Sequence, residues 1–153
     1  AEYQTGRRSL DKKWEMCRGL GLSFGYNRNE GEETVLSGRD LARLLAEYVS
    51  QNGNLLINIG PRADGTIPEI QADRLRKLGA WLKAHGEAIY KTRPWMERQR
   101  DELPGGATAF YTRKGRDLYA VVDGLAPGAR AVRLPVAVPD EYPVHLRLKD
   151  FFA

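Results

Sequence analysis

The stretch that decides the fold runs from Gly53 to Gly65 and reads GNLLINIGPRADG. Its first half is a short, nearly continuous apolar run, which is typical of a strand buried on both faces, as in a parallel sheet covered by helices. Two strong turn signals follow, Gly60-Pro61 and Asp64-Gly65. The stretch therefore predicts a loop at the carboxyl end of a buried strand, which is where α/β barrels place their active sites.

Helix signals stand on both sides of this strand. Ser37, with Asp40 three residues later, forms a capping-box pattern. Apolar residues then recur at helical spacing at Leu41, Leu44, Leu45, Tyr48 and Val49, and Asn52-Gly53 predicts a left-handed helix end. After the strand, the residues from Thr66 to Glu69 predict a second helix with a capping box and a proline in its first turn.

The second helix is expected to end at Gly86. Its inner face would carry Leu75, Leu78 and Leu82, and its solvated face Arg74, Arg76, Lys77 and Lys83. Strand and helix thus alternate over the first part of the chain, which predicts an α/β fold built from βα units.

The composition changes after about residue 94 to shorter segments rich in β-branched and aromatic residues. Residues 107–113 and 117–123, separated by Lys114-Gly115-Arg116, predict a hairpin. Two more short strands are expected over 132–138 and 144–149. Because short strands with open edges invite pairing with another chain, we expect a homo-oligomer.

Length and composition set further limits. The chain has 153 residues, of which 42% are apolar, so it can build a core but is too short for a complete eight-fold barrel of about 250 residues. Its net charge of +4 comes from Lys and Arg dispersed among acidic residues, which argues against a nucleic-acid partner. No signal peptide or membrane-spanning run is present, and the compartment stays unassigned. The single cysteine excludes an internal disulfide and a Cys-based zinc site.

Four ordered blocks of the chain resemble the α-L-fucosidases of glycoside hydrolase family 29. The blocks are Lys13–Cys17 (KWEMC), Ser23–Asn27 (SFGYN), Gly53–Gly65 and the stretch from Gly79 to Trp95. The resemblance implies that residues 1–95 form the last βα units of a (β/α) barrel and that residues 96–153 form part of an antiparallel β-sandwich. It also implies hydrolysis of terminal α-L-fucosyl linkages in a fucosylated glycan or fucoside, with retained configuration and without a metal or organic cofactor.

The resemblance further implies that the chain is a carboxy-terminal fragment of a family member. The family's nucleophilic aspartate and its paired sugar-holding histidines lie upstream of the Trp-Glu block and have no counterpart here. His85 and His145 are the only histidines, and neither lies in a block that matches the sugar-binding ones. We therefore expect little or no fucosidase activity from this polypeptide alone.

Retaining hydrolysis needs two carboxyl groups about 5 to 5.5 Å apart, one as nucleophile and one as proton donor. By the resemblance, this chain supplies at most the donor. An acidic residue some way before the Trp-Glu pair matches the donor of several family members, and Glu2 is the best positional match. Glu15, inside that pair, is the alternative. Proton donation near neutral pH requires a partly desolvated pocket that raises the pKa of the donor.

Aromatic side chains are the candidates for sugar contact. Phe24 matches the family's aromatic that packs against the sugar, where an apolar face would meet the C6 methyl group of fucose, although plain core packing is the alternative. Trp14 and Tyr26 are expected to be pocket walls. A structural role in satisfying loop backbone is favoured for three polar residues at the strand end, Asn54, Asn58 and Asp64.

Two other functions would preserve the same folding residues. One is a non-catalytic carbohydrate-binding remnant, in which the loop aromatics retain sugar affinity without the chemistry. The other is a self-associating module, in which exposed strand edges pair with a second copy and no glycan is bound.

Overall fold

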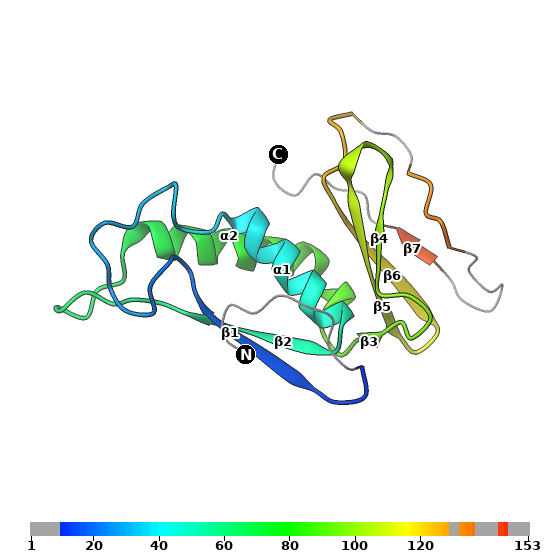
Figure 1. The fold of residues 1–153 in the computed structure, drawn as a ribbon, viewed down its shortest axis with the longest axis horizontal. Helices are drawn as coiled ribbons and strands as arrows, with labels where there is room; N and C mark the ends of the chain where they lie inside the picture. The colour runs from blue at the N-terminus through cyan, green and yellow to red at the C-terminus, as the bar shows by residue number, and fades with distance from the viewer. Residues whose placement is uncertain (1–9, 129–131, 137–143, 147–153) are drawn as a thin grey trace.

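The computed structural model describes residues 10–128, 132–136 and 144–146. A strand–helix–strand–helix unit comes first and a small second sheet follows it (Figure 1). β1 (Trp14–Gly19) pairs in parallel with β2 (Gly53–Asn58), and α1 (Gly38–Ser50) is the crossover between them. α2 (Glu69–His85) follows β2. This order confirms the predicted α/β class.

α1 begins at the capping box that the sequence predicts. The backbone N–H of Asp40 donates to the Ser37 hydroxyl at 3.1 Å, and the Asp40 carboxylate accepts from the backbone N–H of Ser37 at 3.1 Å. The predicted left-handed helix end lies at Asn52, whose φ is 67°. Its side chain donates to the Leu10 carbonyl at 2.7 Å, which compensates for the unfavourable backbone conformation.

α2 starts later than the sequence predicts. Its N-cap is Pro68, with no side-chain hydrogen bond to the helix, so the prediction that Thr66 caps it is wrong. The backbone N–H and hydroxyl of Thr66 instead donate to the Asp64 carboxylate at 2.9 and 2.7 Å. Thr66 therefore closes the loop after β2. The helix ends at Gly86 as predicted.

The two faces of the β1–β2 pair differ, because successive strand residues point to opposite sides. One face packs on the helices: Trp14 lies edge-to-face on Tyr48 of α1 with ring centroids 5.5 Å apart, and Ile57 packs against the apolar cluster that contains Leu41. The other face carries exposed Glu15 and Leu56, which is 48% exposed. No helix of the described residues covers this face (Figure 1). The prediction that β2 is buried on both faces is thus wrong for the described chain.

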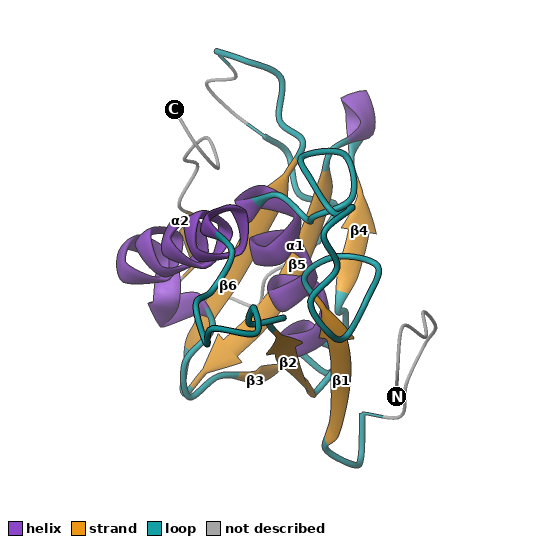
Figure 2. Cartoon of the chain, turned by 90° about the vertical axis from the view of Figure 1, so that its left-hand side faces the viewer, coloured by secondary structure: helices purple, strands orange, loops and turns teal. Residues whose placement is uncertain are grey.

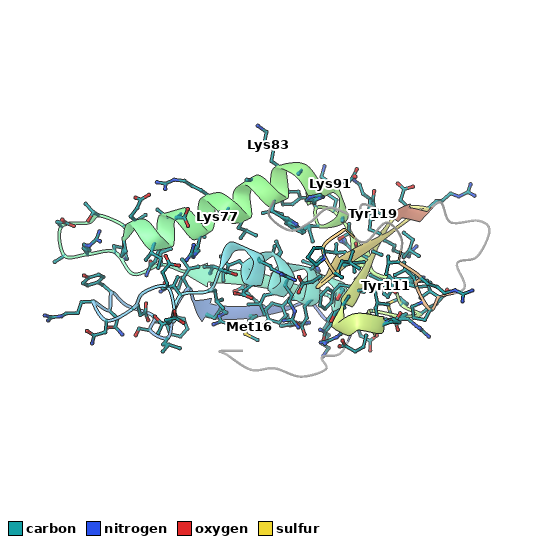
Figure 3. All side chains as sticks on the ribbon, turned by 90° about the horizontal axis from the view of Figure 1, so that it is seen from above. Met16, Lys77, Lys83, Lys91, Tyr111 and Tyr119 are labelled. Carbon is teal, nitrogen blue, oxygen red and sulfur yellow. The ribbon has the colours of Figure 1, made fainter. Side chains whose placement is uncertain are left out.

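The charged face of α2 also differs in part from the prediction. Lys83 points away from α1 (Figure 3) and Lys77 is exposed, as expected. Arg74 is only 8% exposed because its guanidinium pairs with the carboxylates of Glu32 and, at 2.8 Å, Asp73. This contact joins α2 to the loop that follows β1. None of the helices in the described residues combines the length and apolar character that a bilayer span requires.

In the described residues, the second sheet has five strands around the predicted hairpin of β5 (Thr108–Lys114) and β6 (Asp117–Asp123). β3 (Arg93–Pro94) and β4 (Arg100–Glu102) pair antiparallel with β5, whereas β7 (Val144–Leu146) pairs in parallel with β6. Residues 132–136 are not in a strand, contrary to the prediction for 132–138, of which 137–138 lie outside the described residues. The described residues of this region thus form one sheet with one parallel pairing.

One face of this sheet packs against α1 and α2 (Figure 2). Phe110 of β5 is buried against Ala42 and Ala46 of α1 in a shared apolar cluster. Two arginines flank the Phe110 ring, Arg43 of α1 with its guanidinium carbon at 5.9 Å and Arg100 of β4 at 5.7 Å. Cation–π contacts therefore rim the apolar junction between helix and sheet.

The other face of the sheet has its own core around Tyr111. The ring of Trp95 lies edge-on to Tyr111 at 5.6 Å, and the Tyr111 hydroxyl donates to Asp101 at 2.9 Å. Burial, the hydrogen bond to Asp101 and the negative charge of Asp101 together raise the pKa of Tyr111.

This shift predicts an alkaline loss of stability. Because the pKa of Tyr111 is raised above the value of about 10 that tyrosine has in an unfolded chain, its contribution is complete below about pH 10 and is lost as the pH rises further. We expect the free energy of unfolding, measured by urea denaturation, to fall as the pH rises above about 10. Tyr111→Phe should reduce this fall, whereas Tyr90→Phe, at an exposed tyrosine, should not. An unchanged pH dependence in Tyr111→Phe would contradict the assignment.

A second prediction concerns the close packing of Gly53 in β2 against Trp14 in β1. A Cβ atom on Gly53 would lie 2.6 Å from the Trp14 ring, which cannot move easily because it packs on Tyr48 and its Nε1 donates to the Gln51 carbonyl at 2.8 Å. Gly53→Ala should lower the free energy of unfolding by about 1–3 kcal/mol. Gly79→Ala, in α2 and facing open space, should raise it by about 0.5–1 kcal/mol. Equal stabilities of the two variants in urea denaturation would refute this account.

Candidate functional site

Two loops meet at the carboxyl ends of β1 and β2. Since the strands are parallel, both ends lie at the same edge of the sheet. The loops approach so closely that a Cβ atom on Gly60 would come within 2.7 Å of the Gly25 carbonyl group and the Tyr26 nitrogen. Glycine at position 60 is therefore required by the contact between the loops, which form one surface.

Exposed aromatic residues of the first loop lie on this surface. Phe24 is 38% exposed and Tyr26 is 48% exposed. The Tyr26 ring lies 5.9 Å from the guanidinium carbon of Arg62, which comes from the second loop. The Asn58 side chain, at the end of β2, donates to the Phe24 carbonyl. The aromatic pair is thus presented by one loop and supported by the strand and loop beside it.

A cleft of about 250 Å³ opens next to Tyr26. Its polar lining comes from both loops and the first turn of α2, and includes Asn27, Arg28, Glu30, Arg62, Glu69 and Gln71. Gln71 is buried, and its side-chain oxygen accepts from the Gly60 backbone N–H at 2.9 Å. The cleft therefore offers cationic, anionic and amide groups beside an aromatic face, a combination suited to a polar ligand with one apolar side.

The polar residues at the strand end hold the loops, as predicted for Asn58 and Asp64. Asn58 satisfies the Phe24 carbonyl, and Asp64 accepts from Thr66. The hydrogen bonds from Thr66 lower the pKa of Asp64 below its usual value. Asn54 is exposed on β2.

Two of the other predicted site residues, Trp14 and Glu15, lie apart from this edge. Trp14 is at the amino end of β1, with the packing contacts to Tyr48 and Gln51 described above. Glu15 follows it on the face away from the helices. Glu15 lies four residue steps before Gly19 at the loop edge, which corresponds to about 13 Å along the strand. Glu2 lies outside the described residues.

Sequence reasoning missed Arg62 and Gln71. The turn residues around Arg62 indicated a loop but not that its guanidinium would meet Tyr26 of another loop. Gln71 looked like an ordinary helix residue, since nothing local shows that Gly60 donates to it. Among the described residues, no cluster of three or more histidines, cysteines or acidic residues is placed to hold a metal ion.

Comparison with known proteins identifies the family of the chain. The family model for α-L-fucosidase matches residues 1–87, which is more than half of the chain. The chain belongs to the α-L-fucosidase family. The family resemblance seen in the sequence is thereby confirmed, and the relatives are glycosidases.

Individual relatives support this membership. Human plasma α-L-fucosidase is 43% identical over 115 residues, which cover 73% of this chain and 24% of the relative. The α-L-fucosidase of Branchiostoma floridae is 44% identical over 111 residues, with 72% and 24% covered. The Thermotoga maritima α-fucosidase, solved in complex with fucose, is 53% identical with a TM-score of 0.64, covering 67% of this chain and 24% of that chain. The chain thus spans about a quarter of the length of the curated relatives it matches.

The contact between the two loops can be tested with a pair of glycines. Gly60→Ala forces a Cβ atom against backbone that cannot move without shifting the loop, so we expect a loss of about 1–3 kcal/mol in the free energy of unfolding. Gly31→Ala, in the first loop but facing open space, should leave stability within about 0.5 kcal/mol. Urea denaturation measures both, and a tolerated Gly60→Ala would show that the loops do not pack as described.

Proposed function

We propose that this chain supplies the carboxy-terminal part of a retaining α-L-fucosidase, and that the loop edge after β1 and β2 forms part of the fucose site. The observation that carries this proposal is the joint exposure of Phe24 and Tyr26 beside Arg62 at the carboxyl ends of two parallel strands. An exposed aromatic face suits the C6 methyl group of fucose, and the surrounding polar side chains suit its hydroxyls. The related Thermotoga enzyme has been solved with fucose bound.

In this proposal residues 1–95 are the last βα units of a (β/α) barrel. The parallel pairing of β1 and β2 through a helical crossover supports it. The strand face opposite the helices would then look into the barrel interior, which accounts for the exposure of Leu56 in the described chain. Residues 96–153 would be part of an antiparallel β-sandwich. β3, at Arg93–Pro94, already pairs with β5, so the change of sheet falls close to residue 95.

The chain would contribute at most one of the two carboxyl groups that retaining hydrolysis needs. Glu2 and Glu15 are the candidates for the proton donor. Active sites of α/β barrels lie at the carboxyl ends of the strands, and Glu15 lies near the amino end of β1, which favours Glu2. The nucleophilic aspartate would come from outside these residues, so the chain alone should have little or no fucosidase activity.

The substrate would be a terminal α-L-fucosyl residue of a glycan or a small fucoside. A mechanism with two carboxyl groups needs no metal or organic cofactor.

A second candidate function is that of a non-catalytic remnant that binds sugar or associates with itself. The exposed Leu56 on the open face of the β1–β2 pair favours self-association, because parallel sheets are normally covered on both faces. A homo-oligomer would cover this face. Molar mass that rises with concentration, together with flat fucose titrations, would support this candidate over the enzyme.

The sugar contact is tested by titrating the purified chain with L-fucose. We expect Phe24→Ala to weaken binding about 10-fold, equivalent to about 1.4 kcal/mol, since it removes the apolar face. Met96→Ala truncates another exposed apolar side chain, outside the two loops, and should leave the dissociation constant unchanged. Equal affinities of Phe24→Ala and the native chain would refute the contact.

Catalysis is tested by release of nitrophenol from 4-nitrophenyl α-L-fucoside, with Glu2→Gln and Glu15→Gln beside the native chain. We expect no appreciable turnover in any sample. Turnover by the native chain that is lost in one variant would overturn that expectation and identify the proton donor.

A further inference from the structure

We propose that Glu30 is the positioning residue of the sugar-facing loop, whose carboxylate fixes Leu22 and Ser23 so that Phe24 is held at the strand edge. The inference rests on the proposed contact between Phe24 and fucose. It assigns a role to an acidic side chain of the cleft that takes no part in proton transfer.

The first observation is a pair of hydrogen bonds to one carboxylate oxygen. The backbone N–H groups of Leu22 and Ser23 both donate to Oε1 of Glu30 at 2.8 Å. The two donors immediately precede Phe24 in the chain. Their orientation therefore fixes the direction in which the backbone enters Phe24.

The second observation explains the glycine at position 21. A Cβ atom there would lie 2.4 to 2.6 Å from the carboxylate atoms of Glu30. Gly21 does not have a positive φ, so its backbone conformation is open to other residues. The space occupied by the Glu30 carboxylate is thus the reason that a larger residue does not fit at position 21.

The third observation is that Glu30 is itself anchored. Its backbone N–H donates to the Asn27 carbonyl at 3.2 Å, which places Glu30 in a turn. The Asn27 side chain donates to the Ser23 hydroxyl at 3.0 Å. On the other side of Phe24, Asn58 donates to the Phe24 carbonyl. The loop is thus held before Phe24 by Glu30 and at Phe24 by β2.

The hydrogen bonds of the Glu30 carboxylate go to the backbone of its own loop, as a role in positioning that loop requires. Oε1 accepts both amides, and Oε2 is buried with no hydrogen-bond partner among the described residues. A glutamine at this position would keep one accepting oxygen of the same reach. Glu30→Gln is therefore the conservative variant that should preserve the loop, whereas Glu30→Ala removes its acceptor.

The test combines amide hydrogen exchange at Leu22 and Ser23 with L-fucose titration of the full chain. In Glu30→Ala and in Gly21→Ala we expect at least about 10-fold faster exchange at both amides and about 10-fold weaker fucose binding. Gly21→Ala displaces the carboxylate without changing it chemically, because the far end of a flexible side chain moves more easily than the backbone. Glu30→Gln should retain both properties within about twofold.

Combining the two variants gives a sharper result. If Gly21→Ala acts only through the carboxylate, it should cause no further change in exchange or affinity in the Glu30→Ala background. Glu33→Ala removes an exposed carboxylate from the same loop and should change neither property.

Unchanged exchange in Glu30→Ala and Gly21→Ala would overturn the proposal, as would faster exchange with unchanged fucose affinity. The proposal would also be overturned if Gly21→Ala and Glu30→Ala acted independently, so that their effects on exchange rate and affinity multiplied in the double variant. A native chain that binds no fucose would instead refute the proposed sugar contact, and the exchange rates would still decide whether Glu30 holds the loop.

Discussion

The parallel pairing of β1 with β2 is the constraint on which the rest of the structure depends. Parallel strands cannot be joined by a tight turn, so the chain must cross over the sheet, and α1 provides that crossover. The same pairing brings the loops after both strands to one edge. Its register places Asn58 opposite Gly19, at the edge where the loop after β1 begins. From this position the Asn58 side chain donates to the Phe24 carbonyl. A slip of one residue would turn Asn58 to the opposite face and release the loop.

α1 also determines where the second sheet lies. One side of the helix packs on the parallel strands through Leu41 and Tyr48. Another side carries Ala42 and Ala46, which share an apolar cluster with Phe110 of the second sheet. Small side chains at this contact allow the sheet to approach the helix closely. Ion pairs complete the junction, with Arg39 donating to Asp123 at 2.8 Å. The crossover helix therefore links the loop edge to the β-rich part of the chain.

Local signals predicted those parts of the fold that depend on a few neighbouring residues. The Ser37 capping box, the left-handed Asn52 and the hairpin at residues 114–116 follow from short-range chemistry, and the structure has all three. The exposure of Leu56 could not be predicted, because burial depends on what covers a strand rather than on its own residues. Arg74 is buried and pairs with Glu32, which lies far from it in the sequence. Glu30 left no pattern in the sequence, since its partners are backbone amides.

The loop after β1 shows why polar contacts decide the geometry of the candidate site. Its two ends are tied together by apolar burial, with Leu20 1% and Val35 4% exposed. Between them Leu22, Phe24 and Tyr26 remain exposed and contribute little burial energy to the loop. A loop that keeps its apolar side chains available for a ligand must take its shape from hydrogen bonds instead. Glu30, Asn27 and Asn58 supply them, so the groups that shape this loop are not the groups proposed to touch the sugar.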